Sequence, residues 1–480
     1  MPGAIWDESL VENLGTRPEL YVNFSSDPPP KPPATAQGTV YIVGVSDWGP
    51  TNAAVDLFTR RDVEMFLGTD ASPRRTAVLE AFKQGATRVI YRRIADNTAA
   101  KATVTLKDSV PEDVLNVTAK HTGTFGNTIR VEVVSNLNGT DKDLNIYVGP
   151  RRVDTFTGAN NTALVAAFTA QGSEYVDVTI SGTGNRVPAN VAPTALTGGV
   201  SGSGVVAQDY LTALDASIGV RFRALVIETD DYTIQSAVTA WVKEQRDSGN
   251  KVVAIFGAAS DDTKSDINVQ AGALNYEGVH LVGNGGITAD GVTLTPLYAS
   301  WAVAGLAVAR GTSSITNQHL VGWQDAAYKY AQAEYGPALT SGVIIISADR
   351  GPVKIEQGLN TLQPGSQVAP KSRDWRKMRY VAIQDEMVDR INVQMADQYL
   401  GNVPNDDRGR REAVRQTQSI LDGMVRDALL EGLNPANSED QPGPEAFLDP
   451  RFPSTQDRVF VGITGKVVDS IEYFYITVAI

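Results

Sequence analysis

The sequence has 480 residues, of which 42% are hydrophobic and 20% are charged, so it carries enough apolar material for about two to four packed domains. Its 42 basic and 55 acidic side chains leave a net charge of −13, which argues against a protein that wraps bare nucleic acid. The absence of cysteine excludes disulfides, thiolate metal sites and cysteine nucleophiles. The three histidines are scattered and the acidic pairs lack calcium-loop spacing, so no metal or cofactor site is predicted.

No membrane-spanning or secreted segment is predicted. The best apolar stretch, Tyr298–Ala309, has 12 residues, whereas a spanning helix needs about 20. The first residues lack the basic start and apolar core of a secretion signal. We therefore expect no membrane insertion, and we expect the protein to stay in the compartment where it is made.

Residues 1–38 are predicted to form an extended arm. A short strand-like run is followed by Asp27–Pro33, which holds five prolines in seven residues and favours an extended polyproline II spacer. A disordered tail is the alternative, but the aromatic residues of the arm are costly to leave in water. The strand-like residues are Leu20, Tyr21, Val22, Asn23 and Phe24.

The middle of the chain divides into three units by pattern. Residues 39–97 indicate a strand, two helices and a strand, with Thr59 as a candidate N-cap of the first helix. Residues 98–200 alternate in short runs separated by turn residues, which is typical of a β-sandwich insert. Residues 201–370 alternate between buried-strand and helix patterns, which predicts a parallel or mixed sheet covered by helices. The fold class is therefore a multidomain α/β protein, α+β overall.

Residues 371–480 are predicted to hold two amphipathic helices and then two strands, Arg458–Ile463 and Val467–Ile480. The end of the last strand is apolar on both faces, so it must be buried in a sheet of its own subunit or of another. The residues of this end are Tyr473, Phe474, Tyr475, Ile476, Thr477, Val478, Ala479 and Ile480.

The string Gly311–Ser314 resembles the nucleophile turn of subtilisin-like proteases. His280 and Asp230 or Asp231 precede it, so the order Asp, His, Ser can be composed. Only 33 residues separate His280 from Ser313, and the flanking residues differ from those of that protease family. We favour a helix C-terminal turn for this string, and a serine hydrolase that uses Ser313 is the alternative function.

Arginines cluster at the start of the second C-terminal helix. They are Arg408, Arg410, Arg411 and Arg415. One interpretation is a solvated helix face, and the other is complementary contact with charged neighbours in an assembly.

Several strings together resemble the tail sheath proteins of contractile phage tails and phage-like particles. The most specific is Val117–Val133, in which a Gly-x-x-Gly-Asn turn joins two strands. Departures are Ser341–Ile346 and Leu359–Leu362, which differ from the usual Gly-Ile-Asn strand and Arg-Thr-Leu string. The other matching strings are Thr39–Val45, Trp48–Asn52, Asp62–Gly68, Ala77–Arg93 and Trp375–Ile391.

The resemblance implies a structural protein that is not an enzyme. Its central domain, 201–370, would have a subtilisin-like but non-catalytic fold, and 371–480 would be the C-terminal sheath domain. The subunits would form six-membered rings stacked as a helix around an inner tail tube, with baseplate and tail terminator proteins as further partners. Contraction would drive the tube through the target envelope. Another self-assembling virion protein is the remaining alternative.

The resemblance also implies how the subunits are linked. Strands 20–24 and 473–480 would be lent to a sheet of a neighbouring subunit, as in β-augmentation. The arginines at 408, 410, 411 and 415 are expected to face the inner tube. The protein would be a virion component that is assembled in the host cytoplasm.

Overall fold

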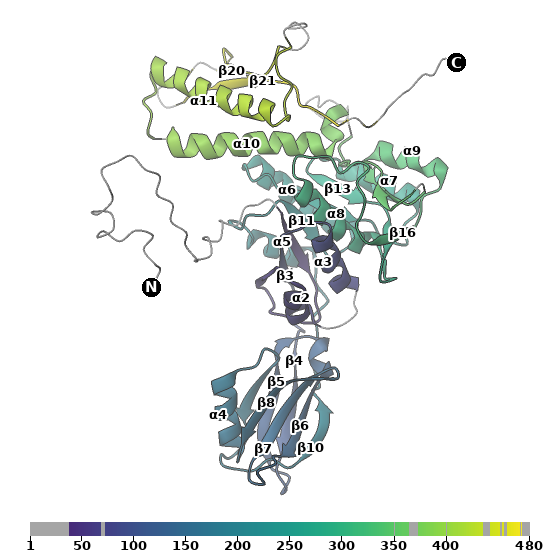
Figure 1. The fold of residues 1–480 in the computed structure, drawn as a ribbon, viewed down its shortest axis with the longest axis vertical. Helices are drawn as coiled ribbons and strands as arrows, with labels where there is room; N and C mark the ends of the chain where they lie inside the picture. Colours follow the sequence, from purple (N-terminus) through teal and green to yellow (C-terminus); the bar gives the residue numbers. More distant parts are fainter. Residues whose placement is uncertain are drawn as a thin grey trace, which may run out of the picture.

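The computed structural model describes residues 38–68, 73–349, 351–363, 373–399, 401–434, 442–451, 454–455, 458–470 and 472. Three parts follow one another along the long axis of the molecule: a β-sandwich, an α/β core and a pair of long C-terminal helices (Figure 1). The expected strands at 20–24 and 473–480 lie outside the described residues. In the described part of the chain, no helix is both long and apolar enough to cross a membrane.

A seven-stranded mixed sheet forms the centre of the α/β core. All neighbouring strands are parallel except β2, which runs antiparallel to β3 at the edge. The units 39–97 and 201–370 thus contribute strands to one sheet, although the sandwich separates them in sequence. In spatial order the strands are β17 (Val343–Ile344), β13 (Val279–Val282), β12 (Val253–Gly257), β11 (Ala224–Ile227), β1 (Thr39–Gly44), β3 (Arg88–Arg93) and β2 (Ala54–Leu57).

Helices cover both faces of this sheet, because alternate residues of the central strands point to two separate apolar clusters. In β1, Val40 and Ile42 face one cluster, while Tyr41 and Val43 face the other. The first cluster is covered by α2 (Arg60–Leu67), α3 (Pro73–Lys83) and α8 (Pro296–Arg310); the second by α5 (Ala207–Asp215), α6 (Tyr232–Asp247), α7 (Lys264–Leu274) and α9 (Gln332–Ser341).

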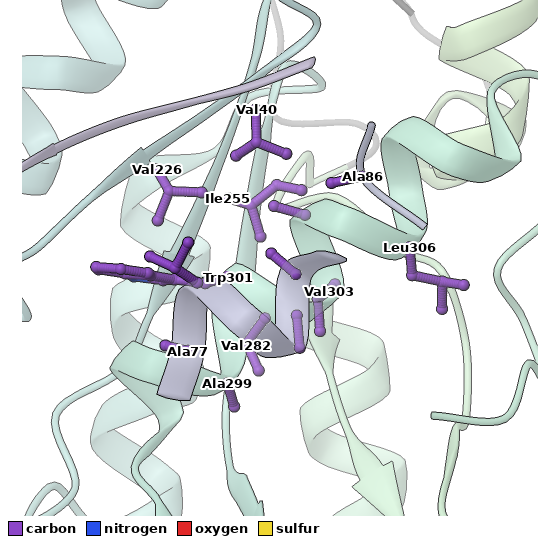
Figure 2. Packing of buried hydrophobic residues seen from close by; sticks show 14 of the residues in the cluster. Val40, Ala77, Ala86, Val226, Ile255, Val282, Ala299, Trp301, Val303 and Leu306 are labelled. Carbon is purple, nitrogen blue, oxygen red and sulfur yellow. The ribbon is translucent and has the colours of Figure 1, made fainter. Parts of the chain in front are cut away.

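Helix α8 packs closely on the sheet and on α3. Figure 2 shows Trp301 and Val303 of this helix beside Val40 and Ile255 of the sheet. Gly305 faces the backbone of α3, where a Cβ atom would overlap Ala81. The absence of a side chain at Gly305 therefore lets the two helices touch through their backbones.

Local capping sets where helices begin. Thr59 accepts a hydrogen bond from the Asp62 N–H at 3.3 Å, and the Asp62 carboxylate accepts one from the Thr59 N–H at 2.8 Å. This reciprocal pair satisfies N–H groups that the first turn of α2 leaves unpaired, and it confirms Thr59 as the N-cap. Asp231 caps α6 by a single bond, in which its side chain accepts from the Thr233 N–H at 2.7 Å.

The β-sandwich insert has two sheets around its own apolar cluster. The predicted insert is confirmed, and helix α4 (Asn161–Gln171), which the alternation pattern did not reveal, packs beside β8 and β9. One sheet holds β10 (Val191–Ala195), β6 (Ile129–Ser135), β7 (Lys142–Val148) and β8 (Arg151–Gly158); the other holds β4 (Lys101–Lys107), β5 (Asp113–Thr122) and β9 (Val176–Ile180). A 3-10 turn, η1 (Thr124–Thr128), joins the sheets.

The C-terminal part is built on the two predicted helices, α10 (Met378–Gln398) and α11 (Asp407–Arg426). A two-stranded sheet, β20 (Glu445–Leu448) with β21 (Val461–Thr464), packs on α11. We predicted a strand from Val467 onward, and this prediction is wrong for residues 467–470, where the structure describes the start of the segment. Val467 makes only an isolated bridge with Leu430, and residues 468–470 form no strand.

Short elements complete the core. They are β14 (Gly285–Thr288), β15 (Thr293–Leu294), β16 (Trp323–Ala327), β18 (Ile346–Ser347), β19 (Lys354–Ile355) and the 3-10 turn η2 (Arg373–Arg376).

Candidate functional site

The N-terminal half of α11 presents a basic face. Arg408, Arg411 and Arg415 are exposed and recur at intervals of three and four residues, which places them on one side of the helix. Glu412 lies among them and contacts Arg415 at 3.3 Å. Arg410 does not belong to this face, because it turns back and donates to the Asn405 side-chain oxygen at 2.7 Å. Three of the four predicted arginines therefore lie on the same face of α11.

The residues of the hydrolase alternative are not arranged as a triad. Ser313 is exposed in the turn after α8, and the N–H of Gly311 there bonds the Ala307 carbonyl at 3.0 Å, so the predicted helix C-terminal turn is confirmed. His280 is buried in β13, with Nδ1 at 2.8 Å from the Leu359 carbonyl, and burial lowers its pKa to about 4. Asp231 caps α6.

A cavity of about 400 Å³ lies at the carboxyl ends of β1 and β11. The strand order of the sheet reverses between these two strands, which is where open α/β sheets form a crevice. The buried Glu228 borders this cavity and accepts hydrogen bonds from Arg74 at 2.5 Å, Tyr91 at 3.0 Å and Tyr298 at 3.1 Å. Burial raises the pKa of Glu228 although Arg74 opposes this. The network ties the strand ends to the first turns of α3 and α8.

The sandwich is fastened to the core by a buried arginine. Arg93, at the end of β3, donates to the carbonyls of Gly49 and Thr122 at 2.7 Å and of Ser201 at 3.1 Å. The Gly49 carbonyl belongs to the core loop between β1 and β2, the Thr122 carbonyl to the end of sandwich strand β5, and the Ser201 carbonyl to the segment that returns from the sandwich to the core. Burial lowers the pKa of Arg93 to about 10, which still leaves the guanidinium charged at neutral pH.

Trp48 completes the same junction from the core side. Its ring is fully buried in the apolar cluster of the sandwich and meets Phe125 at 4.9 Å between centroids. Its indole N–H donates to the Met65 carbonyl of α2 at 3.0 Å. Gly123 has φ +131 and faces the Asp47 carbonyl so closely that a Cβ atom would overlap it. The core loop between β1 and β2 is thus held against the sandwich both by a side chain, Trp48, and by a close backbone contact between Asp47 and Gly123.

The C-terminal helices are fastened to the core by a buried ion pair. Arg246 of α6 makes two hydrogen bonds to Asp385 of α10, at 2.8 and 2.9 Å, and both side chains are at most 7% exposed. Arg223 adds a second positive charge at 3.7 Å from Asp385 and 3.5 Å from Asp389. A two-pronged Arg–carboxylate pair fixes orientation as well as distance.

These junction residues were not singled out from the sequence. Arg93 carried the clearest signal, because a charged residue at the end of a buried-strand pattern must find partners. For Arg246 and Asp385 no signal existed, since the two lie 139 positions apart.

Models of one protein family match three successive stretches of the chain. Residues 95–201 match the phage tail sheath protein beta-sandwich domain, 203–361 the phage tail sheath protein central domain, and 370–480 the phage tail sheath C-terminal domain. The matched boundaries follow the sandwich, the core and the C-terminal helices.

Similar proteins span almost the whole chain. The uncharacterized protein YqbK of Bacillus subtilis (strain 168) is 23% identical over 490 residues, which cover 97% of both chains. The structure of a sheath tail protein from Desulfitobacterium hafniense is 22% identical with a TM-score of 0.71, covering 94% of this chain and 100% of that one. The anti-feeding prophage helical sheath in its contracted state is 13% identical with a TM-score of 0.53, covering 97% and 99%.

The order of these domains defines the class of the protein as a tail sheath subunit, which has a structural role in a phage-type particle. The chain belongs to the phage tail sheath protein family.

Proposed function

We propose that this protein is the subunit of a contractile sheath that stacks as six-membered rings in a helix around an inner tail tube. The succession of three sheath domain models along one chain is the observation that carries the proposal. The similar fold of a contracted helical sheath supports it further. On triggering, the array shortens, widens and drives the tube through the target envelope, as a transition between two packings. Assembly takes place in the host cytoplasm, with baseplate and tail terminator proteins at the two ends.

The subunit catalyses no reaction, and the energy of contraction is conformational. The exposed Ser313 and the buried His280 support this assignment, since a hydrolase needs the base within hydrogen-bond reach of its nucleophile. Ser313→Ala should leave assembly unchanged, and the pure protein should hydrolyse no generic peptide or ester. Serine-dependent turnover would overturn the assignment.

Neighbouring subunits are linked by lent strands, residues 20–24 and 473–480. The β20–β21 sheet is the proposed receiver. It has only two described strands, and such a pair is marginally stable alone. It is also held on the C-terminal apolar cluster through Ala446. Each added strand would contribute several backbone hydrogen bonds at about 0.5–1.5 kcal/mol each.

The basic face of α11, Arg408, Arg411 and Arg415, is proposed to face the tube. Exposed ion pairs contribute about 0–1 kcal/mol each, which suits a contact that must release during contraction. Repetition around every ring supplies the total. Arg410 supports the loop before the helix instead.

Electron microscopy of the purified protein tests the proposal. The full chain should form hollow striated cylinders, and a chain lacking residues 1–26 should remain folded, by circular dichroism, without forming them. Normal cylinders from the shortened chain would contradict the strand exchange. Failure of the full chain to form cylinders with its tube protein would contradict the sheath assignment itself.

A further inference from the structure

The last described residues of the chain cross from the C-terminal helices back to the core. Up to Val468 the segment follows the end of α11: the Glu431 N–H donates to the Lys466 carbonyl at 2.8 Å, and the Val468 N–H donates to the Leu429 carbonyl at 3.0 Å. Beyond Val468 the contacts change partner. Asp469 and Glu472 both pair with Lys377, which immediately precedes α10.

Glu472 is largely enclosed at this crossing. Its side chain is 8% exposed, and its two oxygens have different partners. One lies 3.1 Å from the Lys377 ammonium, and the other accepts a hydrogen bond from the Thr316 hydroxyl at 3.1 Å. The pKa of Lys377 is raised, because its bonds to Asp469 and Glu472 outweigh the larger single effect of burial, which lowers it.

Thr316 is itself fixed within the core. Its hydroxyl accepts from the Gly358 N–H at 3.0 Å, and its own N–H donates to the Ser314 hydroxyl at 3.1 Å. Gly358 in turn accepts from the Met378 N–H at 2.9 Å, at the start of α10. The hydroxyl of Thr316 therefore joins the turn after α8, the strand-like segment at 358 and the C-terminal segment in one place.

We infer that Thr316, Lys377 and Glu472 form an anchor that fixes where residues 473–480 leave the subunit. The inference rests on the proposed exchange of that segment between subunits. A lent strand transmits load only if its root is held, and a root held by the central core passes the load past the α10–α11 pair. The string that resembles a protease nucleophile turn, Gly311–Ser314, thereby acquires a mechanical role, since Arg379 of α10 also donates to the Thr312 carbonyl at 3.2 Å.

The anchor can be tested on the isolated full-length subunit by hydrogen exchange. Glu472→Gln and Thr316→Val should each raise amide exchange in residues 466–472 about ten-fold while leaving the exchange of the core strands unchanged. Glu431→Gln is the matched control, because its partner Lys466 is largely exposed and lies on the same segment. A double-mutant cycle of Lys377→Met with Glu472→Gln should show an effect smaller than the sum of the two single effects. Unchanged exchange at 466–472, or a strictly additive cycle, would overturn the anchor.

Assembly then separates the anchor from the strand exchange. Cylinders of the Glu472→Gln protein should dissociate at a lower guanidinium concentration than wild-type cylinders, and Glu431→Gln cylinders should match wild type. Removal of residues 473–480 should abolish cylinders. If it does so while the anchor variants dissociate like wild type, the anchor is wrong and the exchange stands. Normal cylinders without residues 473–480 would refute the exchange, and with it the role given to the anchor.

Discussion

The sandwich and the C-terminal helices are joined to the same core by opposite electrostatic means. At the sandwich junction the described hydrogen bonds of the Arg93 guanidinium all go to backbone carbonyls, and none goes to a carboxylate. At the C-terminal junction Arg246 has a carboxylate partner, Asp385, on the packed helix α10. Arg93 therefore binds backbone groups, whereas Arg246 binds the side chain of a residue on helix α10.

The difference follows from how the chain connects the parts. The sandwich is an insertion, so a core loop at Gly49, the end of sandwich strand β5 at Thr122 and the returning segment at Ser201 come together, and one planar donor with five N–H groups can bridge all three. The C-terminal helices are connected to the core by one segment and must be oriented by contacts between distant residues. A two-pronged ion pair supplies that orientation, but its free energy is dominated by the cost of desolvating two charges. The two junctions should therefore respond differently to substitution.

Breaking the ion pair should have the largest effect. Asp385→Ala leaves the Arg246 charge buried and unpaired, and should lower the free energy of unfolding by about 3–5 kcal/mol in guanidinium denaturation. Replacing both partners, Arg246→Met with Asp385→Leu, should recover most of that loss. Asp389→Ala is the control, since the Asp389 side chain is 48% exposed, and it should cost about 0–1 kcal/mol. If the double variant is as unstable as Asp385→Ala, the ion pair contributes to the free energy of unfolding as well as to orientation.

Removing the uncompensated guanidinium should cost somewhat less. Arg93→Met leaves three carbonyls without their donor and should lower the free energy of unfolding by about 3 kcal/mol. Arg93→Lys should restore little, because a single ammonium cannot reproduce the planar fork. Arg92→Met tests the neighbouring position, where the half-buried guanidinium donates to the exposed Asn52 carbonyl and also interacts with the Tyr41 hydroxyl, and it should cost less than Arg93→Met. If Arg93→Lys behaves like wild type, the charge rather than the fork geometry holds the junction.

Acid should weaken the C-terminal side of the core more than the sandwich junction. Each of these two regions contains a histidine whose pKa is lowered to about 4 by burial. They are His280, beside Leu359 on the C-terminal side of the core, and His121, beside Trp48 at the sandwich junction. The unfolded chain binds these protons near pH 6.5, so stability falls as the pH drops from about 6.5 to 4, by about 3 kcal/mol at most for the fully buried His280. His280→Asn should flatten this pH slope more than His121→Asn. Urea denaturation at several pH values measures the slopes, and equal slopes in all variants would refute the assignment.

The smallest effects are expected on the surface of α11. Arg411→Gln and Arg415→Gln should each weaken binding of the inner tube by about 0–1 kcal/mol, and only at low salt. Arg426→Gln, exposed at the other end of the same helix, is the control. Co-sedimentation with the tube protein over a salt series measures the difference. Equal binding by all three variants would move the tube contact away from this face.

Periodicity and capping, both read from the sequence, determined much of the architecture. The helix that begins after Thr59, the strand at 39–44, the sandwich insert and the two C-terminal helices depend on residues within a few positions of one another, so local pattern suffices. The prediction failed at residues 468–470, because a local pattern does not supply the neighbouring strand that a strand must pair with.

Tertiary structure alone decided which distant residues meet. That 39–93 and 224–344 share one sheet, that Arg246 meets Asp385, and that Thr316 holds Glu472 all follow from the packing of elements far apart in the chain. Arg410 shows that even neighbouring residues of the same type can differ. Arg408, Arg411 and Arg415 face solvent, whereas Arg410 bonds Asn405 in the loop before α11. Composition and spacing determine which side chains need partners, because burial makes an unpaired charge costly. The choice among many chemically equivalent partners is made only when the sheet and its helices bring particular pairs within hydrogen-bond distance.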